Sequence, residues 1–149
     1  MVSNLSLVIC AGTHTCALNL ADVVEIMRPL PVMPLAGAPE FVQGMSVIRG
    51  APVPVVDLAR VFGIPMQSPS TRFVAVRTGE RAVALSVESV LGIRQIAPAL
   101  LSGMPPLLQK AQPELVEAVG ALDAELFLVL KAGKLVPERV WDSIREEAA

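Results

Sequence analysis

The residues that most often carry enzyme chemistry are scarce in this chain of 149 residues. It contains one histidine, two cysteines, one tryptophan and no tyrosine. A Ser–His or Cys–His site needs a base beside the nucleophile and a third group that orients the base. His14 lies in or beside a polar turn, where we expect it to be solvated, and nearby Cys16 is expected to point into the core. The sequence therefore predicts a protein that is not an enzyme and has no catalytic residues.

Metal, nucleotide and nucleic-acid sites also lack their usual residues. A metal site needs a cluster of Cys, His, Asp or Glu at a recognisable spacing, which this chain does not have. No GxGxxG or P-loop spacing occurs that would cradle a phosphate. The net charge is −2 with no Lys/Arg cluster, whereas nucleic-acid binding needs a basic footprint. We expect no metal, no cofactor and no nucleic-acid partner.

Long apolar runs are missing as well, although 53% of the residues are hydrophobic. A membrane-spanning helix needs roughly 20 apolar residues, and the densest stretch, Leu126–Leu130, has the length of one strand. Residues 5–12 are apolar, but no Lys or Arg precedes them as in a secretory signal. The sequence predicts a cytoplasmic protein that does not insert into the membrane.

The two cysteines are expected to flank a hairpin turn at Gly12-Thr13. That turn places Ile9 opposite Cys16 and Cys10 opposite Thr15, so the two thiols point to opposite faces of the sheet. A disulfide between them would be poorly placed, which agrees with a reducing compartment. We predict two small, wholly or partly buried apolar side chains.

The chain is rich in short Val/Ile runs that are broken by Gly and Pro, the pattern typical of strands. About nine or ten such runs predict an all-β protein, a barrel or a sandwich. They form two sets of about five around residues 64–71, which carry two prolines and two serines. We predict a single domain over residues 1–149 with an internal boundary at 64–71. The predicted strands are residues 5–9, 16–20, 23–27, 41–48, 53–58, 73–76, 82–87, 90–96, 119–122 and 125–130.

Three local features complete the pattern. Pro54, near the start of a strand, suggests a sheet edge or a bulge. Asp57 ends an apolar run as the phospho-acceptor of a receiver domain does, but no acidic residue follows the first strand. We therefore expect a capping carboxylate at Asp57. Residues 137–144 are predicted to be helical, with Val140, Trp141 and Ile144 on one packing face.

Four segments resemble the CheW-like family. Residues 44–58, with the sequence G-M-S-V-I-R-G-A-P-V-P-V-V-D-L, are similar to its signature G-x-x-N-L-R-G-x-x-x-P-V-x-D-L. Residues 23–26 resemble its V-x-E-I element, and residues 79–90 resemble a hairpin ending in V-D-x-V, with Glu88 in place of the aspartate. Residues 120–130 resemble its closing strand pair. The resemblance covers roughly residues 5–136 in the family's order.

The resemblance implies two SH3-like five-stranded β-barrels that share a core, to which our reading of the tail adds a short C-terminal helix. It also implies a non-catalytic adaptor between the cytoplasmic tips of chemoreceptors and the regulatory domain of a CheA-type histidine kinase. By position, Glu25 and Arg49 would lie near the receptor-binding surface and pair with each other. Val23 and Gly44 match neighbouring docking positions, and Ile93 matches a hydrophobic position in the second barrel.

Other readings stay open at this point. Val47 replaces the family's usual asparagine and Ala59 its common arginine, which favours a divergent relative that binds receptors or another adaptor but not the kinase. Glu25 and Arg49 could form an ordinary inter-strand ion pair, and Gly44 could be a backbone requirement alone. A small-ligand-binding or enzymatic barrel using the loop at residues 104–106 is a third reading, without convergent polar groups to support it.

Overall fold

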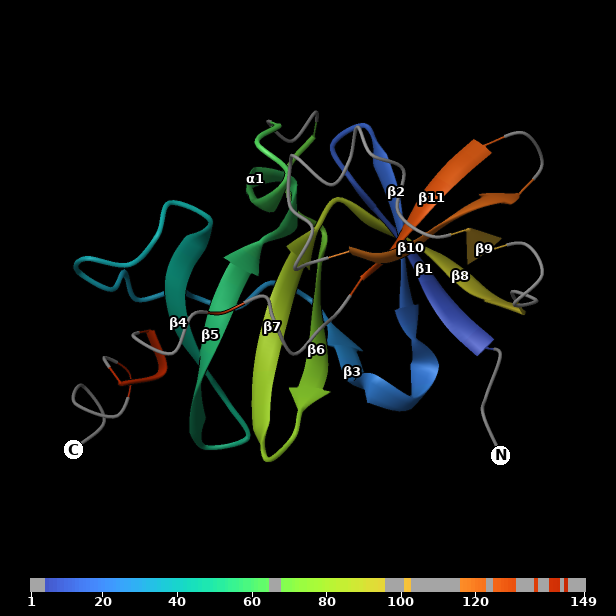
Figure 1. Ribbon diagram of the computed structural model, residues 1–149. Coiled ribbons are helices and arrows are strands. Elements are labelled where there is room, and N and C mark those ends of the chain that lie inside the picture. Colours follow the sequence, from blue (N-terminus) through green and yellow to red (C-terminus); the bar gives the residue numbers. More distant parts are fainter. Residues whose placement is uncertain are drawn as a thin grey trace.

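The computed structural model of this chain describes residues 5–64, 68–95, 101–102, 116–122, 125–130, 136, 140–142 and 144; for 101–102, 116–122 and 125–130 it describes the backbone alone. The fold is all-β, as predicted, with two sheets lying beside each other (Figure 1). The strands are β1 (Leu5–Ala11), β2 (His14–Asn19), β3 (Val23–Met27), β4 (Val42–Ile48), β5 (Ala51–Asp57), β6 (Arg72–Thr78), β7 (Arg81–Val87), β8 (Ser89–Gln95), β9 (Leu101–Ser102), β10 (Val116–Leu122) and β11 (Glu125–Leu130). Two short helical elements, η1 (Leu20–Asp22) and α1 (Leu58–Val61), follow β2 and β5.

One sheet has six strands in the order β8-β1-β2-β11-β10-β9, and the other has five in the order β3-β6-β7-β5-β4. Each contains one parallel pair, β2 with β11 and β5 with β7, among antiparallel neighbours. The resemblance implied five strands in each half. The sixth strand of the larger sheet is β9, which spans only two residues and pairs with β10.

The predicted boundary at residues 64–71 does not separate the two sheets. Strands β5 and β6, which flank it, belong to the same five-stranded sheet. The chain instead changes sheet between β2 and β3, at Leu20–Asp22, and between β7 and β8, at Glu88. The physical reason is that pairing of β2 with β11 joins distant parts of the chain, and a local strand rhythm carries no information about such partners.

A single cluster of buried side chains spans both sheets, so they share a core. It contains Leu7 and Leu18 from the six-stranded sheet together with Val56, Val74 and Leu85 from the five-stranded sheet. The interior strands of the smaller sheet are buried on both faces, which explains their continuous apolar runs. Alternate residues of these and the neighbouring strand form a second cluster on the opposite face, which consists of Val53, Val55, Phe73 and Ala84.

Several local predictions can be compared with the strands directly. The first hairpin places Ile9 opposite Cys16 and Cys10 opposite Thr15, as predicted. Pro54 lies on an interior strand, which corrects the expectation of an edge. Proline is accommodated there because pairing of β5 with β7 begins only at Val55. The bulge lies on the neighbouring strand β4, between Val42 and Gly44.

The described part of the C-terminal segment is helical at residues 140–142 and 144. Val140 and Ile144 are buried in the shared core, and Trp141 packs against the same cluster, which confirms the predicted packing face. Residues 137–139 and the loop at 104–106 lie outside the described residues. Trp141 and Ile144 line a cavity of about 350 Å³ together with residues of β5 and β7, so these helical residues lie against the five-stranded sheet.

Candidate docking site

The two edge strands of the five-stranded sheet, β3 and β4, are tied together by the loop between them. Met33 in this loop forms an isolated bridge with Met45 of β4, with backbone N–H···O distances of 2.8 Å in both directions. The Ser46 hydroxyl also donates to the Pro31 carbonyl oxygen at 2.7 Å. These contacts hold the loop against the edge of β4.

Glu25 and Arg49 pair across the same two edges, as the resemblance implied. Arg49 Nε donates to Glu25 Oε2 at 2.7 Å, and a second guanidinium nitrogen contacts the same oxygen. The Arg49 side chain is 76% exposed and the Glu25 side chain 27% exposed. An ion pair this exposed contributes about 0–1 kcal/mol to folding, so stability alone gives little reason to hold it in place.

The backbone at Arg49 adopts an uncommon conformation. Arg49 has φ 52° and Gly50 has φ 79°, the positive angles that a tight two-residue turn between β4 and β5 needs at both central positions. Among the described residues, Arg49 is the only one other than glycine with a positive φ. A side chain in this region costs about 1–2 kcal/mol relative to the right-handed conformation. Such strained positions concentrate at functional sites.

Gly44 and Val23, which the resemblance also places at the docking surface, have structural roles. Gly44 has φ 144°, and a Cβ there would lie 2.0 Å from the carbonyl oxygen of Met33. Gly44 therefore lets the loop approach β4. Val23 is half-buried against the shared core and its backbone pairs with Val76 of β6.

The sequence reasoning did not select the exposed apolar side chains on the two edge strands and the loop between them. They are Val24 and Ile26 on β3, Met33 in the loop and Val47 on β4, with Val47 71% exposed. The run V-V-E-I-M lacks apolar/polar alternation, so that apolar side chains must lie on both faces of the strand. This was the sequence signal that could have indicated exposed apolar residues on β3. We call Val24, Glu25, Ile26, Val47 and Arg49 the β3 surface.

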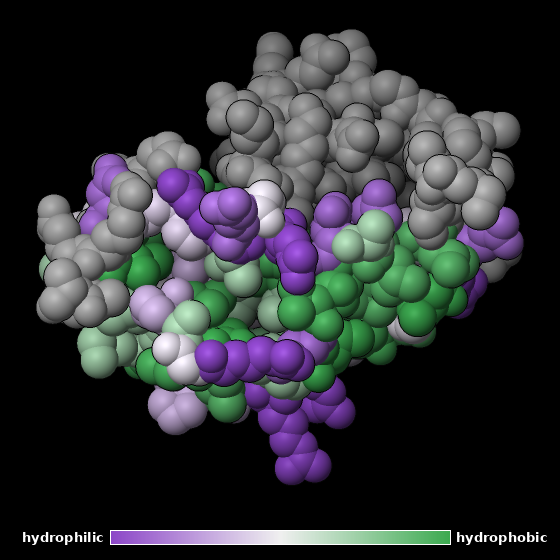
Figure 2. All heavy atoms as spheres, turned by 90° about the horizontal axis from the view of Figure 1, so that it is seen from below, coloured by the Kyte–Doolittle hydropathy of each residue, from purple (hydrophilic) through white to green (hydrophobic). Residues whose placement is uncertain are grey.

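Ile93 lies elsewhere, on β8 at the edge of the six-stranded sheet. It is 58% exposed, next to Leu91 at 53% and near Leu5, on the neighbouring strand, at 41%. We call Leu5, Leu91 and Ile93 the β8 surface. The predicted docking residues thus fall on two sheets. Figure 2 shows apolar side chains gathered over a broad part of the lower face of the molecule.

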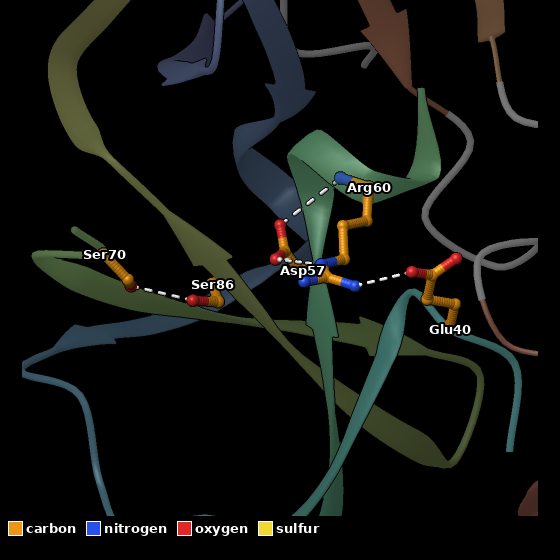
Figure 3. A network of polar contacts seen from close by, with 5 residues as sticks. All are labelled: Glu40, Asp57, Arg60, Ser70 and Ser86. Atoms are coloured by element: carbon orange, nitrogen blue, oxygen red, sulfur yellow. Dashed lines mark hydrogen bonds and ion pairs between the residues drawn. The ribbon is translucent and has the colours of Figure 1, made fainter. Parts of the chain in front are cut away.

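Asp57 caps the short helix α1, as predicted. Its Oδ1 accepts a hydrogen bond from the backbone N–H of Arg60 at 3.3 Å, and Arg60 pairs with Asp57 and with Glu40 at the surface (Figure 3). Ala59, where the family commonly has arginine, is fully buried in the shared core. Arg60 therefore faces solvent from a different side of the turn and does not replace the missing arginine.

The histidine and the cysteines are not set up as nucleophile and base. His14 is half-buried with its ring centroid 5.0 Å from that of Phe62, which corrects the expectation of a solvated side chain. Burial lowers the pKa of His14 and raises the pKa of Cys16 to about 12. Burial, and then the charge of Glu88, raise the pKa of Cys10. Both thiols are therefore protonated near neutral pH, whereas a reactive cysteine needs its thiolate.

Among the residues that the structure describes, no group of three or more His, Cys, Asp or Glu side chains lies close enough together to hold a metal ion. No helix in the same part of the chain is long and apolar enough to cross a membrane.

The fold defines a class: small all-β domains in which two SH3-like halves share one core. Within this class, the family described as "CheW-like domain" matches residues 6–140, and the chain belongs to that family.

The chain is also similar to individual proteins, two in sequence and one in structure. The chain is 24% identical over 128 residues to "Chemotaxis protein CheW" of Rhizobium meliloti, covering 85% of this chain and 83% of that protein. It is 34% identical over 89 residues to "Protein FrzA" of Myxococcus xanthus, covering 58% and 54%. The scaffolding protein TtCheW from Thermoanaerobacter tengcongensis has the same fold, with a TM-score of 0.78, 23% identity, and coverage of 91% of this chain and 98% of that one.

Proposed function

We propose that this protein is a non-catalytic cytoplasmic adaptor that couples chemoreceptors to a CheA-type histidine kinase. The match of the CheW-like family to residues 6–140 carries this proposal. A coupling protein needs at least two docking faces, and the β3 and β8 surfaces lie on different sheets. Large exposed apolar side chains next to strand edges suit partners that bind through a few buried anchors and backbone pairing.

The β3 surface is the proposed contact for the cytoplasmic tip of the receptor. Its exposed apolar side chains, Val24, Ile26 and Val47, lie on the two edge strands that the ion pair ties together. Docking would exclude water from the Glu25–Arg49 pair, which strengthens its electrostatic interaction. The contact with Glu25 holds the Arg49 guanidinium before the partner arrives, so less ordering of this side chain remains to be done on binding.

Charge reversal tests this assignment. We expect Glu25→Arg and Arg49→Glu each to weaken binding of a receptor-tip fragment by roughly tenfold or more, about 1.4 kcal/mol, because each leaves a charge without its partner in the interface. The double reversal restores the opposite-charge pair and should recover part of the affinity. Titration calorimetry with the purified fragment measures both effects.

The Glu40–Arg60 pair provides a matched control. It is an exposed ion pair of similar type, at 2.9 Å, and neither of its residues belongs to the β3 surface. Glu40→Arg should leave receptor binding unchanged. If Glu25→Arg and Arg49→Glu also bind the fragment with wild-type affinity while remaining folded, the β3 surface is not the receptor contact.

The β8 surface is the proposed contact for the second partner, the regulatory domain of the kinase. Ile93→Asp places a charge in an apolar patch and should weaken kinase-domain binding by roughly tenfold or more, while receptor-tip binding stays within about twofold. Arg94→Gln, on the same strand, is the control. If the wild-type protein binds the receptor tip but not the kinase domain, a divergent adaptor that engages only receptors replaces the coupling role.

A further inference from the structure

The cavity of about 350 Å³ beside the C-terminal helical residues adjoins one end of the β3 surface. Its wall includes Pro52 of β5, which lies directly opposite Val47 of β4. Side chains at directly opposed positions lie on the same face of a sheet, and Val47 is 71% exposed. Ala51, another wall residue, is separated from Arg49 by Gly50 alone. Two residues of the β3 surface therefore lie beside the cavity.

The wall of the cavity is mainly apolar and comes from three segments of the chain. Val53 and Ile144 are 5% and 4% exposed, and Ala82 and Trp141 are half-buried. An apolar group that entered would contact these side chains and leave water, which is the main driving force for association. The volume lies at the small end of the range for ligand sites. It suits a single large side chain and is too small for a helix, which is about 10 Å across.

The charged residues of the wall do not favour a charged ligand. The Arg81 guanidinium stacks over the Trp141 ring, with 4.9 Å between its central carbon and the ring centroid, and Arg81 has a further interaction as well. Glu80, the other charged wall residue, is exposed to solvent. In the described part of the chain, every buried side-chain nitrogen and oxygen atom has a hydrogen-bond partner. The cavity therefore selects its occupant by apolar surface, as an anchor pocket in a protein interface does.

We propose that this cavity takes one large apolar side chain of the chemoreceptor tip, from the same segment that docks on the β3 surface. The inference rests on the receptor docking proposed above. A segment over Val47 lies about 5 Å from Pro52, the distance between opposed residues of paired strands, so that a neighbouring side chain reaches the cavity. The kinase domain is assigned to the β8 surface, on the other sheet. A free metabolite would have to leave its polar groups unpaired in the apolar interior.

The single tryptophan of the chain makes occupancy of the cavity directly observable, because Trp141 is part of the wall. Titration with a receptor-tip fragment that contains no tryptophan should shift the emission maximum to shorter wavelength, since the bound side chain excludes water from the indole. The shift should saturate with the same Kd that calorimetry gives. Arg49→Glu, which weakens docking, should move both titration curves by the same factor.

Two variants change the cavity itself. Ala82→Leu fills part of its volume and should weaken binding of the receptor-tip fragment by roughly tenfold, with a smaller fluorescence shift. Ala51→Gln places a polar amide on the wall without adding a charge near Arg49, and should weaken binding by roughly threefold or more. Binding of the kinase regulatory domain should stay within about twofold in both variants.

Ala36→Gln is the matched control, at an exposed alanine that belongs neither to the cavity wall nor to the β3 surface, and it should leave the affinity unchanged. Thermal unfolding establishes that each variant is folded. Because Ala51 is exposed, Ala51→Gln keeps the test decisive even where Ala82→Leu fails to fold.

The outcomes separate the cavity inference from the docking on which it rests. If Arg49→Glu weakens binding while Ala51→Gln and Ala82→Leu bind like Ala36→Gln, the receptor docks on the β3 surface and the cavity inference is wrong. Binding of the fragment without any change in tryptophan fluorescence would overturn it as well. If the cavity variants weaken binding of the kinase domain and not of the receptor tip, the occupant belongs to the kinase and the inference is wrong. If the wild-type protein binds no fragment, the receptor docking fails and the cavity inference fails with it.

Discussion

Replacing Gly44 with alanine is expected to reduce the free energy of unfolding by about 3 kcal/mol or more, because the new side chain would combine a clash with the backbone and a strained φ. The added Cβ would lie 2.0 Å from the Met33 carbonyl oxygen and 2.9 Å from the Pro34 Cα. The backbone of Met33 is held by two hydrogen bonds to Met45, so the obstructing atoms cannot move without breaking the bridge. Urea unfolding of the two proteins measures the difference.

Gly63→Ala is the matched control for this substitution. Gly63 also has a positive φ, 72°, but nothing lies within 4 Å of the position that a Cβ would take. Only the conformational penalty of about 1–2 kcal/mol applies there. If Gly44→Ala is no more destabilising than Gly63→Ala, the loop at Met33 does not lie as close to Gly44 of β4 as the structure places it.

The Gly44 result also bears on the docking assignment. A change at Gly44 should disturb the edge of β4 and the turn that carries Arg49, so a loss of receptor binding in a Gly44 variant would not identify Gly44 as a contact. Val23 carries the same ambiguity because it packs against the shared core. Glu25 and Arg49 do not, because their side chains can be changed with little effect on folding.

Local chemistry was enough to predict the individual strands. The third predicted strand, residues 23–27, has the bounds of β3, and the hairpin of β6 and β7 turns at Gly79-Glu80 as expected. The assignment of strands to sheets was not predictable in the same way. Parallel pairing of Phe127 with Thr15 joins strands from opposite ends of the chain, and no local pattern encodes that partner.

The charged residues of the candidate docking site were predictable from the sequence, but its exposed apolar residues were not. The Glu25–Arg49 pair followed from the family resemblance, and the structure contains it. The exposure of Val24 and Ile26, against the half-buried Val23, depends on which face of β3 the loop and the second sheet cover. Likewise, the cavity beside the C-terminal helical residues joins Val53, Ala82 and Ile144 from three distant segments, so that no sequence window contains it.

The second large effect is expected at alkaline pH and comes from the Cys16 thiol. Cys16 is fully buried, and burial raises its pKa from 9.0 to about 12. Above pH 9 the unfolded chain releases this proton while the folded protein keeps it, so stability falls as pH rises. The slope is about 1.4 kcal/mol per pH unit, which amounts to about 2 kcal/mol at pH near 10.5. Urea unfolding between pH about 8 and about 10.5 measures the loss.

Cys16→Ala should remove this part of the pH dependence, even though its stability at neutral pH is lower because of the lost sulfur contacts. Cys10→Ala is the control: Cys10 is only half-buried, so most of the alkaline slope should remain. The chain has no tyrosine, so the groups that titrate alongside are lysines, the terminus and Cys10, and these are shared by the wild-type and Cys16→Ala proteins. Their difference therefore isolates Cys16. Parallel loss of stability in these two proteins would mean that the Cys16 thiol titrates as it would in water, and that the first hairpin does not bury it in the core shared by the two sheets.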